Sequence, residues 1–401
     1  MSGATIIDLV LLLVIAGQGV TAYKIGLVAS GLSLVGLLAG AVLGLWLLPL
    51  GLAAWGPGGR FLQVMLLVVG TVLLASLGQQ LGRLLGWRLR SLVPEGPLRA
   101  IDSVLGAVAG VVATALIAWF LAAAALPALP PPAASAVTES RALQGINRIV
   151  PGTADRVVAR AGTILGEGGV PRVFSGLERE RIRPVDPPPE GVADGRGVAA
   201  AARSVVEVRG TAATCSREQE GSGWVAAPER VVTNAHVVAG LEHPSVLVGG
   251  KGEPLPATTV AFDPGRDVAV LAVPGLDAPA LPTGESLEHG DPVIAAGFPR
   301  GGAYHLSTGA VRSRLVARGN DIQGNPGAVR QVYATSAKVV PGNSGGPLLS
   351  PTGQVVGTVF ANSTAEATTS YALTLEETRP VIEKASDATE SVPTGSCVSA
   401  P

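Results

Sequence analysis

Four long apolar stretches at the start of the chain constrain its fold more than any other feature. They cover residues 6–23, 26–48, 61–81 and 101–126. Each is long enough to cross a hydrocarbon core about 30 Å thick. The first stretch lacks a basic leader and three others follow it, so it is not a simple cleavable signal peptide. We therefore expect residues 1–126 to form a four-helix transmembrane domain in a lipid bilayer.

The basic residues between these stretches predict the orientation of the helices. Basic loops stay on the cytoplasmic side of a membrane. If the N-terminus lies outside, the first and third loops are cytoplasmic and hold most of the basic residues, whereas the second loop, with Arg60, is outside. Those cytoplasmic residues are Lys24, Arg83, Arg88, Arg90 and Arg99. Everything after residue 126 is then extracytoplasmic, in a multi-pass protein of the cell membrane.

Small residues recur every fourth position in two of the apolar stretches, at Gly36, Gly40 and Gly44 and at Gly106 and Gly110. This spacing allows close helix packing in lipid, although glycine is also common in membrane helices in general. Asp8 and Asp102 lie near the ends of two stretches. An acidic residue deep in the membrane would be a functional candidate, but the sequence alone does not give the depth of these two.

The remainder of the chain is of ordinary soluble composition and divides in two. Residues 127–199 are rich in Pro, Ala and Arg, with prolines at 130–132 and 187–189, and we expect an extracytoplasmic tether there. The net charge of the chain is −1 and no Lys/Arg cluster stands out, which argues against a nucleic-acid partner.

From residue 200 onward the sequence changes to short β-branched runs bounded by Gly and Pro. Such a pattern favours an all-β barrel or sandwich over a parallel α/β sheet. We expect one domain over residues 200–401. The runs include residues 204–208, 222–226, 231–233, 245–248, 268–273, 292–296, 309–311, 331–335 and 354–359.

Three segments in this domain carry candidate chemistry. His236, one of four histidines, follows a strand-like run, and Asp267 precedes an apolar run, with Asp263 as the competing carboxylate. Ser344 lies in the Gly-rich bend Pro341-Gly342-Asn343-Ser344-Gly345-Gly346, where backbone N–H groups of Gly342 and Ser344 could form an oxyanion hole. The chain order His, Asp, Ser is that of the trypsin-like scaffold.

Both halves resemble known families. Ile6-Ile7-Asp8, Lys24-Ile25-Gly26-Leu27 and the segment 102–110 resemble the CvpA (colicin V production) membrane domain. The segments 233–236, 267–271 and 341–349 resemble trypsin-like proteases, most closely the HtrA/Deg branch. Together the two halves are similar to actinobacterial acid-resistance periplasmic proteases.

The resemblance implies a chymotrypsin/trypsin-like double β-barrel and a serine endopeptidase that cuts proteins of the cell envelope during acid or oxidative stress. It implies catalysis by His236, Asp267 and Ser344, a substrate-lining segment at Ala361, Asn362 and Ser363, and no metal or organic cofactor. Lys338 precedes Ser344 by six residues, where related proteases often have a residue at the base of the substrate pocket. We do not predict from it which substrate side chain is preferred. The uncharged Asn343 and the short segment after the barrels argue against activation by a cut N-terminus and against a regulatory PDZ domain.

Cys215 and Cys397 are the 2 cysteines of the chain and lie near the two ends of the globular part. They could form one disulfide in an oxidising compartment, or they could be two unrelated buried thiols. A disulfide closing so long a loop would stabilise the fold by about 4–5 kcal/mol in the loop-entropy estimate.

Two other functional classes stay open at this stage. The protease-like domain could be catalytically silent and act as a sensor. Alternatively, the membrane helices could be the functional part and act as a scaffold. The oligomeric state and the physiological substrate have no signal in the sequence.

Overall fold

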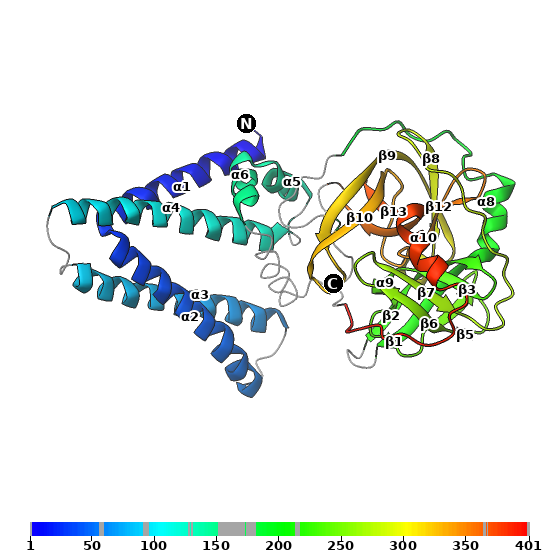
Figure 1. Ribbon diagram of the computed structural model, residues 1–401, viewed down its shortest axis with the longest axis horizontal. Coiled ribbons are helices and arrows are strands. Elements are labelled where there is room, and N and C mark those ends of the chain that lie inside the picture. The colour runs from blue at the N-terminus through cyan, green and yellow to red at the C-terminus, as the bar shows by residue number, and fades with distance from the viewer. Residues whose placement is uncertain are drawn as a thin grey trace. The chain divides into compact units, whose positions relative to one another are not determined.

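The computed structural model describes two compact units (Figure 1). The described residues are 2–55, 60–90, 96–126, 129, 131–150, 173, 182–212, 217–363, 366 and 368–398. The first unit comprises Met1–Ala123 with Glu139–Val150, and the second comprises Ala124–Thr138 with Pro151–Pro401. A large part of the expected tether, residues 151–172 and 174–181, lies outside the described residues.

The described residues of the first unit form four long helices and one short helix. The helices are α1 (Gly3–Ile25), α2 (Leu27–Trp55), α3 (Arg60–Arg90), α4 (Pro97–Ala125) and α6 (Arg141–Ile149). Within the described residues, Gly3–Ile25, Leu27–Leu48 and Pro97–Ala123 are long and apolar enough to cross a membrane. Many of their large apolar side chains are exposed, as expected for helices in lipid. The fourth expected span lies within α3, and the number of crossings stays a prediction.

Close helix packing explains the recurring glycines. A Cβ added at Gly36 or Gly40 of α2 would collide with the backbone of α3 at Gly78 or Leu74. A Cβ added at Gly106 of α4 would collide with the backbone at Gly26. The interpretation of these small residues as helix contacts is therefore confirmed.

Asp8 and Asp102 of the membrane half bind helix ends. The Asp102 carboxylate accepts from the Val28 N–H (3.0 Å) and forms an ion pair with Arg90 (3.1 Å), which joins the beginnings of α2 and α4 to the end of α3. The Asp8 carboxylate accepts from the Ser140 hydroxyl (2.6 Å) and the Ala142 N–H (3.0 Å) at the N-terminus of α6. Both carboxylates thus satisfy helix N–H groups that would lack partners.

The second unit is strand-rich, as expected, with antiparallel pairing between its strands. One sheet has the order β5-β4-β1-β2-β3-β7-β6, and β10-β13-β12-β11-β8-β9 form a closed barrel. The strands of the first sheet are β1 (Val205–Ala212), β2 (Arg217–Ala227), β3 (Arg230–Thr233), β4 (Ser245–Val248), β5 (Leu255–Pro256), β6 (Thr258–Asp263) and β7 (Val268–Ala272).

The strands of the closed barrel are β8 (Pro292–Gly297), β9 (His305–Asn320), β10 (Pro326–Thr335), β11 (Pro347–Leu349), β12 (Val355–Asn362) and β13 (Ser370–Thr374). The helix α10 (Leu375–Lys384) follows β13. The observed β9 is far longer than the expected run 309–311, because its outer half alternates exposed and buried residues without a continuous apolar signal.

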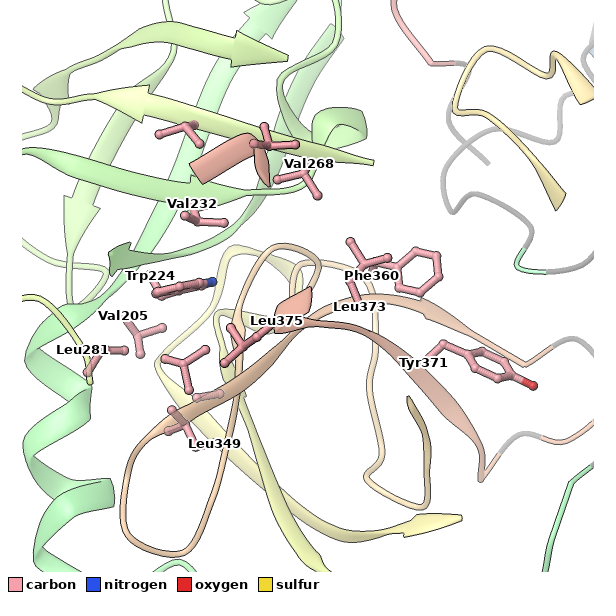
Figure 2. Packing of buried hydrophobic residues seen from close by; sticks show 14 of the residues in the cluster. Val205, Trp224, Val232, Val268, Leu281, Leu349, Phe360, Tyr371, Leu373 and Leu375 are labelled. Carbon is pink, nitrogen blue, oxygen red and sulfur yellow. The ribbon is translucent and has the colours of Figure 1, made fainter. Parts of the chain in front are cut away.

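Three of the hydrophobic clusters among the described residues hold the strands of the two sheets together. One fills the first sheet around Val206 and Leu271, and another fills the closed barrel around Val293 and Leu348. The largest lies between them, where Trp224 and Val232 of the first sheet meet Phe360 and other side chains of the second (Figure 2). Trp224 is 1% exposed and donates its indole N–H to the Thr358 hydroxyl (3.1 Å). The two sheets are therefore docked by a shared core.

The helix α8 (Arg196–Ala201) packs onto this shared core. Val198 is fully buried within it, and Gly197 lies against the backbone of Thr352. The expected boundary at residue 199/200 passes through α8. Residues assigned to the tether therefore contribute to the packing of the strand-rich unit, and the domain limits stay a prediction.

Candidate active site

His236 and Asp267 form a closely bonded pair in the first sheet. His236 lies in α9 (Ala235–Val238), directly after β3, and Asp267 directly precedes β7. The antiparallel register pairs Thr233 with Ala269, which brings the two side chains together. The imidazole Nδ1 lies 2.8 Å from Asp267 Oδ2, and the His236 backbone N–H donates to Oδ1 at 2.9 Å. The carboxylate therefore fixes both the position and the orientation of the imidazole.

Asp267 is fully buried and has an unusual backbone conformation. Its φ of 63° lies in the left-handed region, which aspartate tolerates better than most residues. Asn234, itself fully buried, donates its side-chain N–H to the Asp267 carbonyl at 2.8 Å. Asn234 thus holds the turn that presents the carboxylate, a role that the sequence alone did not suggest.

The competing carboxylate, Asp263, has a different role. It accepts from the Arg266 N–H (2.8 Å) and from the Arg266 guanidinium (3.0 Å). These contacts close an exposed turn between β6 and β7. Asp267 is accordingly the carboxylate that contacts His236.

Ser344 lies in the bend between β10 and β11, and its main chain is fixed by neighbouring N–H donors. Three N–H groups of the bend have carbonyl partners: Asn343 donates to Val340 (3.1 Å), Gly345 to Val359 (2.8 Å) and Gly346 to Asn343 (3.0 Å). The N–H groups of Gly342 and Ser344 have no acceptor among the described residues. The two expected oxyanion donors are therefore available to a ligand.

This bend lies against the segment that carries His236. The Ser344 carbonyl accepts from the Ser222 N–H of β2 at 2.8 Å. A Cβ added at Gly345 would lie 2.3 Å from the Thr233 hydroxyl and 3.0 Å from the Asn234 nitrogen, which explains the glycine there. In the part of the chain that the structure describes, Ser344 Oγ forms no hydrogen bond with His236. Such bonds are often long before substrate binds.

The expected substrate-lining residues lie at the end of β12. Ala361 and Asn362 pair with β13 on one edge, and the Asn362 side chain donates to the Val339 carbonyl (3.0 Å). Ser363 continues this contact by donating its N–H to the Thr369 carbonyl (2.9 Å). The register with β11 ends at Thr358, so Ala361 and Asn362 of β12 have no β11 partner. Lys338 is exposed.

The remaining sequence candidates lie elsewhere or outside the description. Cys397 packs near Gly240 after α9, while Cys215 lies outside the described residues, so their disulfide stays a prediction. Among the described residues, no cluster of three His, Cys, Asp or Glu side chains suits a metal ion.

Tyr304 lies in the loop between β8 and β9, near this site. Its ring packs against that of Phe298 with a centroid distance of 5.8 Å. Burial raises the pKa of its phenol to about 12, because the phenolate would lose solvation there.

A docked pair of antiparallel sheets, a His–Asp pair in the first and a serine in a Gly-rich bend of the second define the class of trypsin-like serine proteases. A trypsin-like peptidase domain matches residues 221–357, and the colicin V production protein family matches residues 7–151.

The relatives are consistent with this class along almost the whole chain. Serine protease Rv3671c of Mycobacterium tuberculosis (strain ATCC 25618 / H37Rv) is 35% identical over 397 residues, which cover 98% of this chain and 98% of that protein. The crystal structure of the Rv3671c protease from M. tuberculosis, active form, has a TM-score of 0.53 and 41% identity and covers 55% of this chain and 97% of that chain.

Another relative matches about a third of the chain. The "Probable periplasmic serine endoprotease DegP-like" protein of Pseudomonas putida (strain W619) is 36% identical over 140 residues, 34% of this chain and 28% of that protein. The chain belongs to the family of HtrA-related, trypsin-like serine proteases with an N-terminal colicin V production domain. It is a serine endopeptidase, and its substrates are proteins.

Proposed function

We propose that this endopeptidase hydrolyses peptide bonds with the triad Ser344, His236 and Asp267. The observation that carries the proposal is the buried His236–Asp267 pair beside a serine bend in which the Gly342 and Ser344 N–H groups alone lack acceptors among the described backbone donors of residues 342–346.

In this mechanism, Ser344 Oγ attacks the substrate carbonyl while His236 Nε2 takes the hydroxyl proton. His236 then gives that proton to the leaving amine, and water hydrolyses the acyl-enzyme by the same route. Asp267 holds the imidazole in the tautomer with Nδ1 protonated and stabilises the imidazolium. The oxyanion accepts from the Gly342 and Ser344 N–H groups, which in a comparable enzyme lower the barrier by about 3–4 kcal/mol per donor. An extended substrate would lie as an added strand along Ala361, Asn362 and Ser363.

Labelling with a serine-directed probe tests this assignment. The full-length protein in detergent is treated with a fluorophosphonate, and the modified residue is mapped by mass spectrometry. We expect modification at Ser344 that is lost in the His236→Ala protein, because an unactivated serine reacts slowly. Modification of a different serine, or none in a well-folded protein, would reject the triad and favour a catalytically silent sensor.

We also propose that four spans anchor the enzyme in the cell membrane with its N-terminus and protease domain outside. The basic loops around Lys24 and Arg90 support this orientation, and a relative of the strand-rich part carries the word periplasmic in its name. An extracytoplasmic domain would allow the Cys215–Cys397 disulfide, and a melting temperature that does not respond to reductant would reject it.

The biological role that we propose is proteolysis of envelope proteins during acid or oxidative stress, on the strength of the family resemblance. A deletion strain that regains stress survival with a Ser344→Ala protein would instead support the scaffold role of the membrane helices.

A further inference from the structure

Ser222 is a buried residue outside the proposed triad that contacts the nucleophile bend at two points. It lies in β2 of the first sheet and is fully buried. Its backbone N–H donates to the Ser344 carbonyl at 2.8 Å. Its hydroxyl lies 2.7 Å from the Gly342 carbonyl oxygen and 2.9 Å from the Phe298 nitrogen.

The two partners of the Ser222 hydroxyl fix the direction of its proton. The Phe298 N–H can only donate, and the Gly342 carbonyl can only accept. Ser222 Oγ therefore accepts from Phe298 and donates to Gly342, and both bonds have ordinary lengths. Gly297 makes room for this arrangement, because a Cβ added there would lie 2.7 Å from Ser222 Oγ.

Gly342 lies between two peptide planes, and the hydrogen bond from Ser222 to the Gly342 carbonyl fixes the second of them. Gly342 has a φ of 95°, where glycine rotates with little steric cost. On its other side, the Pro341 carbonyl accepts from the Arg300 N–H at 2.9 Å. A trans peptide directs its N–H away from its C=O, so the Arg300 bond sets the direction of the Gly342 N–H. The hydrogen bond from Ser222 sets the plane of the next peptide, between Gly342 and Asn343.

We propose that Ser222 is a positioning residue for the oxyanion hole: its hydroxyl holds the Gly342 carbonyl so that the Gly342 and Ser344 N–H groups converge. The inference rests on the proposed role of Ser344. Ser222 belongs to the first sheet, which positions His236 and Asp267. Gly342 lies in the bend between β10 and β11 of the closed barrel. The geometry of the oxyanion hole thus depends on the docking of the two sheets.

The test compares Ser222→Ala with Ser222→Cys in the full-length protein. Alanine removes the hydroxyl but keeps the backbone bond to Ser344, and cysteine offers a weaker donor of similar size. Loss of a whole oxyanion donor costs about 10²–10³-fold in kcat, and displacement of one donor should cost less. We expect kcat on a peptide anilide to fall about 10- to 100-fold in Ser222→Ala with little change in KM, and less in Ser222→Cys.

Binding of a peptide boronate separates positioning from general destabilisation. The tetrahedral boronate adduct occupies the oxyanion hole, so its affinity should fall by the same factor as kcat in each Ser222 variant. The matched control is Ser350→Ala, which removes another buried serine hydroxyl, bonded to Thr352 and Gln354 in the turn after β11. We expect no change in kcat there.

Two outcomes would overturn the inference. One is a Ser222→Ala protein with kcat and boronate affinity within about twofold of wild type. The other is a fall in kcat that boronate affinity does not follow. If Ser222→Ala does not fold, Ser222→Cys decides by the same two measurements. Failure of the triad itself would be recognised separately, by full activity of Ser344→Ala.

Discussion

At the scale of single residues, the site depends on short hydrogen bonds between the Asp267 carboxylate and His236. Asp267 uses both oxygens on His236, and Asn234 holds the left-handed turn that presents them. A left-handed non-glycine residue is strained by roughly 1–3 kcal/mol and persists where its surroundings fix it. The strain here is located at the contact that orients the proposed base.

We predict that Asp267→Asn lowers kcat about 10⁴-fold without unfolding the protein, because an amide favours the wrong imidazole tautomer. The measurement is peptide-anilide hydrolysis, with the folded state checked by circular dichroism. Asp263→Asn is the matched control, since Asp263 contacts only the exposed Arg266 turn among the described residues. Equal losses in both variants would contradict the assignment of Asp267.

The buried phenol of Tyr304 predicts a loss of stability at alkaline pH. Burial raises the pKa of this tyrosine from 10.0 to about 12, so the folded state keeps a proton that the unfolded chain releases. The stability that Tyr304 contributes is therefore complete below pH 10 and is lost as the pH rises through about 12. The difference in ultraviolet titration between wild type and Tyr304→Phe should show this pKa. A tyrosine signal near pH 10 in that difference would contradict it.

At the scale of elements, the register of β3 against β7 and the helix α8 decide what the local sequence could not. The β3–β7 pairing brings the residues after β3 to the residue before β7. The helix α8 shows no strand pattern, yet its apolar face closes the core shared by the two sheets.

We predict that Val198→Ala lowers the free energy of unfolding of the protease unit by about 2 kcal/mol, because it opens a cavity in a packed core. Thermal or urea denaturation measures this loss. Ala199→Ser, at an exposed position of the same helix, is the control and should change stability by less than about 0.5 kcal/mol. Equal stability of Val198→Ala and wild type would mean that α8 does not contribute to the core.

At the scale of the whole molecule, the two units of the chain are built for different surroundings, one for lipid and one for water. The first unit exposes apolar side chains on its long helices, whereas the second buries its apolar residues in several clusters. The helix α6 follows the last long helix in sequence, but belongs to the first unit through Asp8 and through the bond from Trp119 to Asn147 (2.8 Å). Attachment to the membrane unit thus extends beyond the apolar stretches.

The proposed topology predicts opposite labelling at the N-terminus and at the start of α4, where the third basic loop ends. In a Cys215→Ser, Cys397→Ser background, Ser2→Cys should react with a membrane-impermeant maleimide in intact cells. Arg99→Cys should react only after the membrane is opened, because basic loops stay inside. Reaction of Arg99→Cys in intact cells, with Ser2→Cys protected, would reverse the orientation.

The sequence by itself determined the features that local composition and spacing encode. The continuous apolar stretches predicted the long helices, the short β-branched runs bounded by Gly and Pro predicted an all-β barrel or sandwich, and the bend around Ser344 predicted donors at Gly342 and Ser344. Each of these signals lies within a few consecutive residues, where steric and hydrophobic preferences act directly.

Only the tertiary structure decided the contacts between residues distant in the chain. The contact between Asp267 and His236 depends on the β3–β7 register, and the bond from Ser222 to Gly342 depends on the docking of the two sheets. Neither Asn234 nor Ser222 differs in type from an ordinary turn or strand residue. Their roles arise because packing of the shared core brings their polar groups to carbonyls that need buried partners.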